Sequence, residues 1–238
     1  MEIIPLGDSA LIVRLRERFD DAPEQTLDIV FRAFQRLQNA AIPGVIEFAP
    51  AYTSVSVLFD PITVAKAAEK PDKVFDWLAA RISAAVAGVA GSSKTARSRA
   101  RTVDIPVCYD PEFALDIDDV ARRANISPDE VIRLYGAAEY RVACLGFVPG
   151  FPFLAGLPKQ LATPRRDVPR KQIPPGSVGI GGAQTGIYPL RSPGGWNLIG
   201  RTPLRLFDPE KNPPTLLRAG ERVRFRKISR DEFESFKR

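Results

Sequence analysis

The sequence predicts an α+β protein in two parts, a small α/β sandwich followed by a small, irregular β-barrel or sandwich. Strand-like and helix-like patterns alternate over residues 1–86, and the composition turns to Ala, Gly, Ser and Arg over residues 87–101. Most of the 17 glycines and 22 prolines lie between Gly146 and Pro214. We therefore expect an N-terminal α+β domain at 1–86, a basic flexible linker at 87–101 and a β-barrel domain at 102–238.

The first domain follows hydrophobic periodicity closely. Apolar residues at steps of three and four predict a helix from about Pro23 to Asn39 with one buried face. Pro43-Gly44 ends this helix, and a second helical region runs from about Pro61 to Val86. Alternating patterns predict strands at residues 3–4, 9–15, 45–48 and 54–59. The economical arrangement of these elements places two helices over one face of a small, mostly antiparallel sheet.

The positive charge of the chain is concentrated in one short segment. The formal net charge is +6, and the stretch 92–101 contributes Lys94, Arg97, Arg99 and Arg101 without an acidic residue. No aromatic residues that could stack on bases are interleaved with them. We interpret the segment as a solvated linker and expect no nucleic-acid partner; a nucleic-acid-binding arm is the alternative.

The second domain begins with a strand at 102–108 and a pair of helices. Ser127, Pro128 and Glu130 are typical of a capping box at the start of the second helix. From Tyr140 onward, turn residues separate short alternating runs, which predicts a barrel or sandwich with long loops. These runs are residues 140–145, 177–180, 187–190, 197–199, 204–207 and 222–225.

The composition excludes several classes of function. The chain has no histidine, which excludes a Ser-His-Asp or Cys-His catalytic system and a His-ligated metal, so we expect no metal site. Cys108 and Cys144 form no CxxC pair, and we expect them to be buried, unpaired thiols. No apolar run approaches the roughly 20 residues that span a bilayer, and Glu2 and Asp8 are atypical of a signal peptide. We expect a cytoplasmic chain that makes no membrane contact.

The segment 145–158 carries the first group of candidate ligand-binding residues. Gly and Pro forbid a helix or a long strand here, so the Phe side chains are expected on a stiff loop. Such a loop indicates a hydrophobic wall of a cleft or a partner-docking surface, and a plug at one end of the barrel is the alternative. The candidates are Gly146, Phe147, Pro149, Gly150 and Phe151.

The segment 163–177 carries basic candidates. Arg165, Arg166, Arg170 and Lys171 stand between prolines, opposed only by Asp167. Arginine forks held in this way suit recognition of phosphate or carboxylate, because guanidinium offers bidentate donors. A solvated loop is the alternative. We take Arg165 and Arg170 as the candidates for ligand binding.

The glycine-rich segment 176–209 matches neither standard nucleotide motif. The dinucleotide fingerprint needs a following helix, whereas a strand-like run follows here, and the GxxxxGK[ST] sequence is absent. Backbone amides in such a loop could still bind an anion. The polar residues among these glycines are plausible ligand contacts: Gln184, Thr185, Tyr188, Arg191, Asn197, Arg201 and Thr202. We take Gln184, Thr185, Tyr188 and Arg201 as the candidates, and Trp196 could lie either in the core or in the site.

Five stretches of the second domain stand in the order and spacing of a known family. They read GFVPGFPFLAGLP, TPRRDVPR, PPGSVGIGGAQTGIYP, SPGGWNLIGRTPLRLFDP and NPPTLLRAGERVRF. With them the chain resembles the family of the bacterial 5-oxoprolinase B subunit (the PxpB/KipI family), also called allophanate hydrolase subunit 1 or the carboxyltransferase-domain subunit. The resemblance covers the second domain and, more loosely, the first.

The resemblance implies that the barrel is cyclophilin-like and that the chain takes part in ATP-dependent cleavage of 5-oxo-L-proline to L-glutamate. The chain would act on this small amide with a homologous C subunit and an A subunit, and it would be inactive alone. ATP with Mg²⁺ would be held by the assembled complex, and no cofactor would be covalently bound. The residues expected at the cleft are those of the loop Gly146–Gly150 together with Arg165, Arg170, Gln184, Thr185, Tyr188 and Arg201.

One position departs from the family pattern and leaves other functions open. Relatives commonly carry a histidine in the helix where this chain has Tyr135, which puts a proton-transfer role of that position in doubt. One alternative is a binding module that inhibits a sporulation-type histidine kinase, as the antikinase members of the family do. Another is the carboxyltransferase subunit of a urea carboxylase or allophanate hydrolase system that uses biotin.

Overall fold

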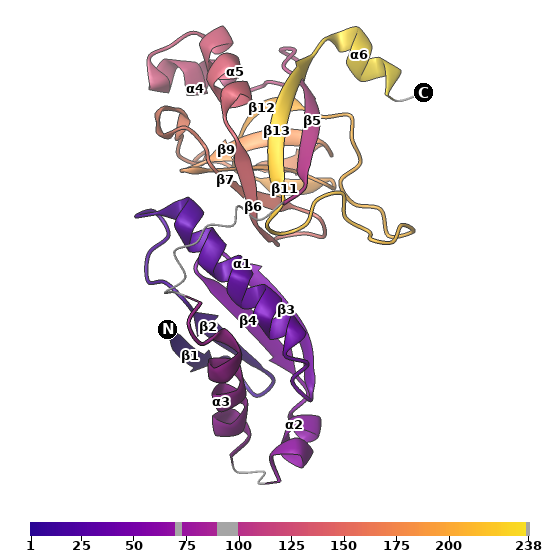
Figure 1. Cartoon of the computed structure of the whole chain (residues 1–238). Coiled ribbons are helices and arrows are strands. Elements are labelled where there is room, and N and C mark those ends of the chain that lie inside the picture. Colours follow the sequence, from indigo (N-terminus) through magenta and orange to yellow (C-terminus); the bar gives the residue numbers. More distant parts are fainter. Residues whose placement is uncertain (70–72, 90–99, 237–238) are drawn as a thin grey trace. The chain divides into compact units, whose positions relative to one another are not determined.

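The computed structural model describes residues 1–69, 73–89 and 100–236 (Figure 1). The chain divides into two compact units, Met1–Ser98 and Arg99–Arg238, which are described separately below. The linker predicted at 87–101 falls largely on residues 90–99, which lie outside the described residues. The predicted domain bounds at 86 and 102 lie on either side of the division between the units.

The first unit is a four-stranded antiparallel sheet with helices. The strands follow the order β1-β2-β4-β3, with the last pair out of sequence order. They are β1 (Glu2–Pro5), β2 (Ala10–Arg14), β3 (Val45–Ala51) and β4 (Ser54–Phe59), and the helices are α1 (Pro23–Asn39), α2 (Pro61–Ala68) and α3 (Val74–Val86). The single helical region expected after Asp60 is therefore two helices.

The buried face of this sheet packs against α1 and α3. Leu11 and Val55 from the strands, Val30 from α1, and Leu78 and Ile82 from α3 share one fully buried core. The apolar steps of three and four residues in the sequence therefore correspond to real buried stripes. The α/β sandwich predicted for this part of the chain is confirmed.

The start of α2 shows why that helix begins where it does. Asp60 caps it, because its Oδ1 accepts a hydrogen bond from the Ile62 backbone N–H at 3.0 Å. Pro61 occupies the first helical position, where a backbone N–H would have no partner within the helix. The Thr63 hydroxyl also donates to Asp60, at 2.5 Å, and together these hydrogen bonds lower the pKa of the Asp60 carboxyl.

The second unit contains a closed barrel of seven strands in the order β10-β7-β6-β13-β5-β12-β9, with β9 pairing to β10 to close it. Strands β5 and β13 run parallel, and the other neighbours are antiparallel. The barrel strands are β5 (Thr102–Cys108), β6 (Tyr140–Leu145), β7 (Pro152–Ala155), β9 (Ser177–Gly181), β10 (Gln184–Ile187), β12 (Asn197–Arg201) and β13 (Arg222–Ile228). A separate two-stranded sheet pairs β8 (Arg170–Ile173) with β11 (Ser192–Gly194). The α+β class with a barrel in the second part is confirmed.

The helices of the second unit are α4 (Ile117–Ala124), α5 (Pro128–Ala137), a 3₁₀ turn η2 (Lys159–Leu161) and α6 (Arg230–Ser235). The capping box predicted at α5 is half formed. The Ser127 hydroxyl accepts a hydrogen bond from the Glu130 backbone N–H at 3.2 Å, but the Glu130 carboxylate accepts from Arg133 at 2.6 and 2.7 Å instead of reaching back. A complete box stands at α6 between Ser229 and Glu232, which the sequence reasoning missed.

Two predicted strands are wrong, and the strands β7, β8, β10 and β11 were missed. Strand β10 ends at Ile187, where the expected run began, and residues 204–207 contribute only an isolated bridge between Phe207 and Thr215. Of the missed strands, β7 lies inside the segment predicted as a loop. Pro152 is its first residue, a position at which the missing N–H costs little.

Cys108 and Cys144 are both buried and unpaired, as predicted. Burial raises the pKa of both thiols, that of Cys144 to about 11. Among the described residues, no helix combines the length and the apolar character that crossing a membrane requires.

Candidate functional site

The turn between β6 and β7 builds one wall of a cavity in the second unit. The Gly146 N–H donates to the Phe151 carbonyl at 3.2 Å, and within the turn the Val148 N–H donates to the Gly146 carbonyl at 2.8 Å. Phe147 adopts a φ of +67°, a conformation that costs free energy for a residue with a side chain, and it is 60% exposed. Strained, exposed aromatic residues are typical of ligand-binding loops rather than of packing.

Behind this turn, aromatic rings pack edge to face. The Phe151 ring centroid lies 5.2 Å from that of Tyr188 and 5.4 Å from that of Trp196, and all three residues are buried. Trp196 packs directly over Gly181, where any Cβ would collide with the indole Nε1. Gly179 and Gly181 thus make room for a tryptophan.

The resulting cavity has a volume of about 300 Å³, and we call it the aromatic cavity. It is lined by Phe147, Phe151, Phe153, Arg165, Pro169, Tyr188, Pro193, Gly194, Gly195 and Trp196. Among these ten described residues, Arg165 and Tyr188 carry the ionisable side chains. The Arg165 guanidinium carbon lies 6.0 Å from the centroid of the Trp196 ring, at the outer range of a cation–π contact.

The Tyr188 hydroxyl is closely packed. It lies so close to Gly194 that a Cβ there would collide with it. Burial raises the pKa of this phenol, although the neighbouring Trp196 backbone and the charges of Arg165 and Arg170 oppose the rise. Tyr188 is therefore a neutral hydrogen-bond donor at neutral pH rather than a base.

Of the eleven residues predicted as ligand contacts, Phe147, Phe151, Arg165 and Tyr188 line the aromatic cavity together. Gly146, Pro149 and Gly150 belong to the turn that carries Phe147. Gly150 has a φ of +79°, and a Cβ there would lie 2.8 Å from the Cβ of Phe207. These three residues therefore shape the site rather than line it.

Arg170 has an internal partner. Its two Nη atoms donate to the two carboxylate oxygens of Asp116 at 2.8 and 2.9 Å, and Arg166 donates to the same carboxylate at 2.6 Å. The Asp116 side chain is 2% exposed, and it also accepts from the Leu198 backbone N–H at 2.7 Å. The geometry thus gives Arg170 a structural role outside the cavity lining.

The remaining predicted contacts lie elsewhere in the barrel. Thr185 is fully buried, donates to the Gly179 carbonyl at 2.8 Å and lies 2.7 Å from the Tyr135 hydroxyl. Gln184 begins β10 opposite Gly181 and is half-buried. Arg201 donates to the Pro175 carbonyl at 2.8 Å and stacks near Phe113, and burial lowers its pKa. The structure does not bring these three to the aromatic cavity.

The sequence reasoning missed part of the lining. Phe153, Pro169, Pro193, Gly194 and Gly195 were not among the candidates, and Trp196 was left open. The signal available was the run SPGGW, in which two glycines precede a large aromatic residue. Such a run allows a backbone to approach a neighbouring side chain closely, which it does at Tyr188.

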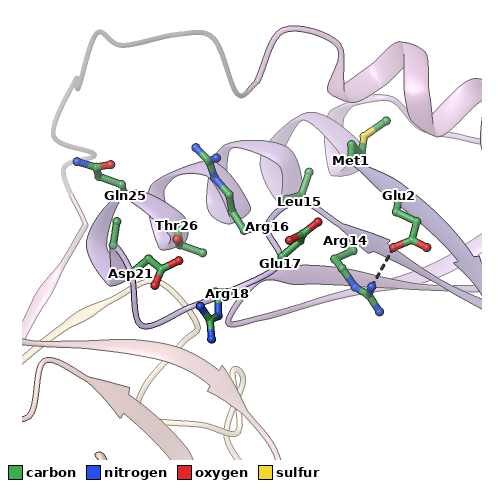
Figure 2. Close-up of a pocket in the computed structure, with 11 residues that line it drawn as sticks. Met1, Glu2, Arg14, Leu15, Arg16, Glu17, Arg18, Asp21, Gln25 and Thr26 are labelled. Atoms are coloured by element: carbon green, nitrogen blue, oxygen red, sulfur yellow. Dashed lines mark hydrogen bonds and ion pairs between the residues drawn. The ribbon is translucent and has the colours of Figure 1, made fainter.

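A further hollow of about 580 Å³ lies in the first unit (Figure 2). Its side chains come from the start of β1, the chain that follows β2 and the first turn of α1. Three arginines and three acidic residues line it, and Arg14 pairs with Glu2 at 2.9 Å. With balanced charges and no aromatic side chain in its lining, this hollow offers less to a specific ligand than the aromatic cavity does.

The fold and the candidate site define a two-unit α+β protein whose second unit carries an aromatic cavity edged by an arginine. Residues 1–217 match the family described as carboxyltransferase domain, subdomain C and D, and the chain belongs to this family. Among curated relatives, the 5-oxoprolinase B subunit of Bacillus subtilis is 44% identical over 239 residues, covering 99% of this chain and 96% of the relative. The 5-oxoprolinase B subunit of Escherichia coli is 38% identical over 92% of this chain and 93% of the relative.

Other similarities extend to longer chains. The crystal structure of TTHA0988 superposes with a TM-score of 0.73 at 35% identity and covers 92% of this chain, which spans 40% of that longer chain. A putative urea carboxylase of Emericella nidulans is 30% identical over 129 residues, which are 50% of this chain and 10% of the relative. The suspected membership of the family of 5-oxoprolinase B subunits is confirmed by these matches.

Proposed function

We propose that this chain is a subunit of an ATP-dependent 5-oxoprolinase that hydrolyses 5-oxo-L-proline to L-glutamate. It acts with a homologous C subunit and an A subunit and is inactive alone. The observation that carries the proposal is the near-full-length similarity to two proteins named as the B subunit of 5-oxoprolinase. Both relatives are named as subunits, which supports the proposal that this chain acts within a complex of several chains.

The chemistry of the aromatic cavity suits this substrate. 5-Oxo-L-proline is a five-membered lactam ring that carries one carboxylate. Rings such as Phe151 and Trp196 offer flat walls for the lactam, and Arg165 at the edge offers a guanidinium for the carboxylate. Tyr188 also lines the cavity, and burial keeps its phenol protonated, so its hydroxyl can donate to the lactam carbonyl oxygen.

The rest of the chemistry is assigned to the assembled complex. An unstrained lactam is a stable amide, and ATP supplies the driving force by phosphorylating its carbonyl oxygen before water adds. The chain has no histidine, and Arg165 and Tyr188 do not serve as bases at neutral pH. We therefore assign the base, ATP and Mg²⁺ to groups that this chain and its partner subunits provide together. The longer TTHA0988 chain supports this division, because the present fold occupies 40% of it.

The test is reconstitution of the complex from separately purified A, B and C subunits. Release of glutamate from 5-oxo-L-proline should require ATP and all three chains. Replacement of Arg165 by Gln should raise KM for 5-oxo-L-proline about tenfold, as expected for loss of one charge-assisted hydrogen bond. The control is Arg191→Gln, which removes an exposed arginine outside the cavity lining that bonds to Gln172 at 3.2 Å. Glutamate release that continues without this chain overturns the proposal.

The match to the putative urea carboxylase favours a second candidate, a carboxyltransferase that acts on urea or a related amide. Transfer of a carboxyl group from a separately supplied carboxybiotin carrier to urea, with no glutamate release from 5-oxo-L-proline, would support it over the first. Inhibition of a histidine kinase stays a prediction of the family resemblance.

A further inference from the structure

We propose that a groove beside the aromatic cavity binds a small ligand through a phosphate group. This arginine groove has a volume of about 630 Å³. It is lined by Asp119, Arg122, Arg123, Thr163, Pro164, Arg165, Arg166, Asp167, Val168 and Asn197. Its volume lies within the range of ligand sites in proteins, roughly 300–1,000 Å³.

Two segments bring the arginines together. Arg122 and Arg123 lie on the last turn of α4. Arg165 and Arg166 lie on the loop that leads into β8, which we call the arginine loop. Thr163 and Asn197, 6% and 5% exposed, lie between these segments. The Asn197 side chain donates to the carbonyls of Pro164 and Ile180 at 2.8 and 3.1 Å, which anchors the arginine loop to the barrel.

The charges of the groove do not cancel. Arg122 pairs with Asp119 at 2.8 Å, while the single carboxylate of Asp116 is shared by Arg166 and Arg170. In the part of the chain that the structure describes, Arg123 and Arg165 have no carboxylate within ion-pair distance. The lining carries four guanidinium groups and the two carboxylates of Asp119 and Asp167. Asp116 and Arg170, which lie outside the lining, add one charge of each sign, so an excess of two positive charges remains, which matches a phosphate dianion.

Arg165 lines both the arginine groove and the aromatic cavity. A phosphate held by Arg123 and Arg165 would therefore lie next to a ligand in the aromatic cavity. If the proposed function holds, the phosphates of ATP would lie next to the bound 5-oxo-L-proline. That assignment rests on the proposed function, whereas phosphate binding in the groove does not.

The test is a calorimetric titration of the full chain with tripolyphosphate at constant ionic strength. We expect saturable binding at one site per chain. Arg123→Gln should weaken this binding at least about fivefold, because Arg123 is an exposed groove residue without a carboxylate partner. Its matched control is Arg133→Gln, which removes the same charge from α5, outside the groove lining, and should change the affinity less than about twofold. Thermal unfolding should be unchanged in Arg123→Gln.

The outcomes separate this inference from the proposed function. No saturable binding, or equal weakening by Arg123→Gln and Arg133→Gln, overturns the arginine groove even where the complex hydrolyses 5-oxo-L-proline. Binding that Arg123→Gln weakens and Arg133→Gln does not supports the groove even if glutamate release fails. Arg165→Gln should weaken both tripolyphosphate and 5-oxo-L-proline, since it lines both hollows.

Discussion

Asp116 accepts hydrogen bonds from both Nη atoms of Arg170, at 2.8 and 2.9 Å, at the start of α4 where its side chain is almost fully buried. Arg166 donates to the same carboxylate, and so does the Leu198 backbone N–H from β12. One carboxylate thus ties α4, the arginine loop and the barrel wall together. A buried charge of this kind stabilises only while its partners are present.

The first prediction concerns this buried ion pair. Asp116→Ala should lower the free energy of unfolding by about 3 kcal/mol, because it leaves two guanidinium groups and the Leu198 N–H without their partner. Arg170→Ala should also lower the free energy of unfolding. The control is Asp104→Ala, which breaks an exposed pair with Arg224 and should cost less than about 1 kcal/mol. Urea denaturation measures all three, and equal effects of Asp116→Ala and Asp104→Ala would contradict a structural role for Asp116.

The second prediction concerns Tyr135, the position at which the family resemblance leads us to expect a histidine. Its hydroxyl lies 2.7 Å from that of Thr185 inside the barrel, and burial raises its pKa well above the ordinary value. Tyr135→Phe and Thr185→Val should each cost about 1 kcal/mol of stability, and the double variant should cost less than their sum. Activity of the reconstituted complex should stay unchanged in Tyr135→Phe. A loss of activity without a loss of stability would instead assign Tyr135 a catalytic role.

The third prediction concerns Phe147 and distinguishes the free-energy cost of its strained backbone from ligand binding by its ring. Its φ of +67° is costly for a residue with a Cβ and free for glycine. Phe147→Gly should therefore raise the free energy of unfolding by about 1 kcal/mol, while the complex loses affinity for 5-oxo-L-proline. Phe147→Ala keeps the strained backbone and removes the ring, so it should lose affinity without the gain in stability. Full affinity in both variants would show that the ring makes no contact with the ligand.

The fourth prediction concerns alkaline pH. Burial raises the pKa of the Cys144 thiol from 9.0 to about 11, so between these values the folded chain keeps a proton that the unfolded chain has lost. The stabilisation is complete below a pH of about 9 and declines as the pH rises to about 11. Cys144→Ala should make the loss of stability over this interval smaller by about 2 kcal/mol. Parallel urea titrations at both ends of the interval measure this difference; identical losses in both proteins would show that Cys144 does not titrate in this range.

Local chemistry explains which elements were predicted well. The helix from Pro23 to Asn39 and the strands at 54–59 and 102–108 were read with their observed bounds, because periodicity and caps act within a few residues. The strand β7 was missed because its identity depends on pairing with β6 and β10 rather than on its own composition. The Glu130 carboxylate turned to Arg133 because a charged partner competes with the cap.

The sequence alone determined the α+β class, the change in character after residue 101, the absence of histidine chemistry and the concentration of glycine and proline in one stretch of the second unit. Only the tertiary structure decided which residues of that stretch meet. It brought Phe147, Arg165, Tyr188 and Trp196 to one cavity, and it placed Thr185 in the core and Arg170 on Asp116. The physical reason is that side chains from separate loops and strands meet through barrel closure, which no local pattern encodes.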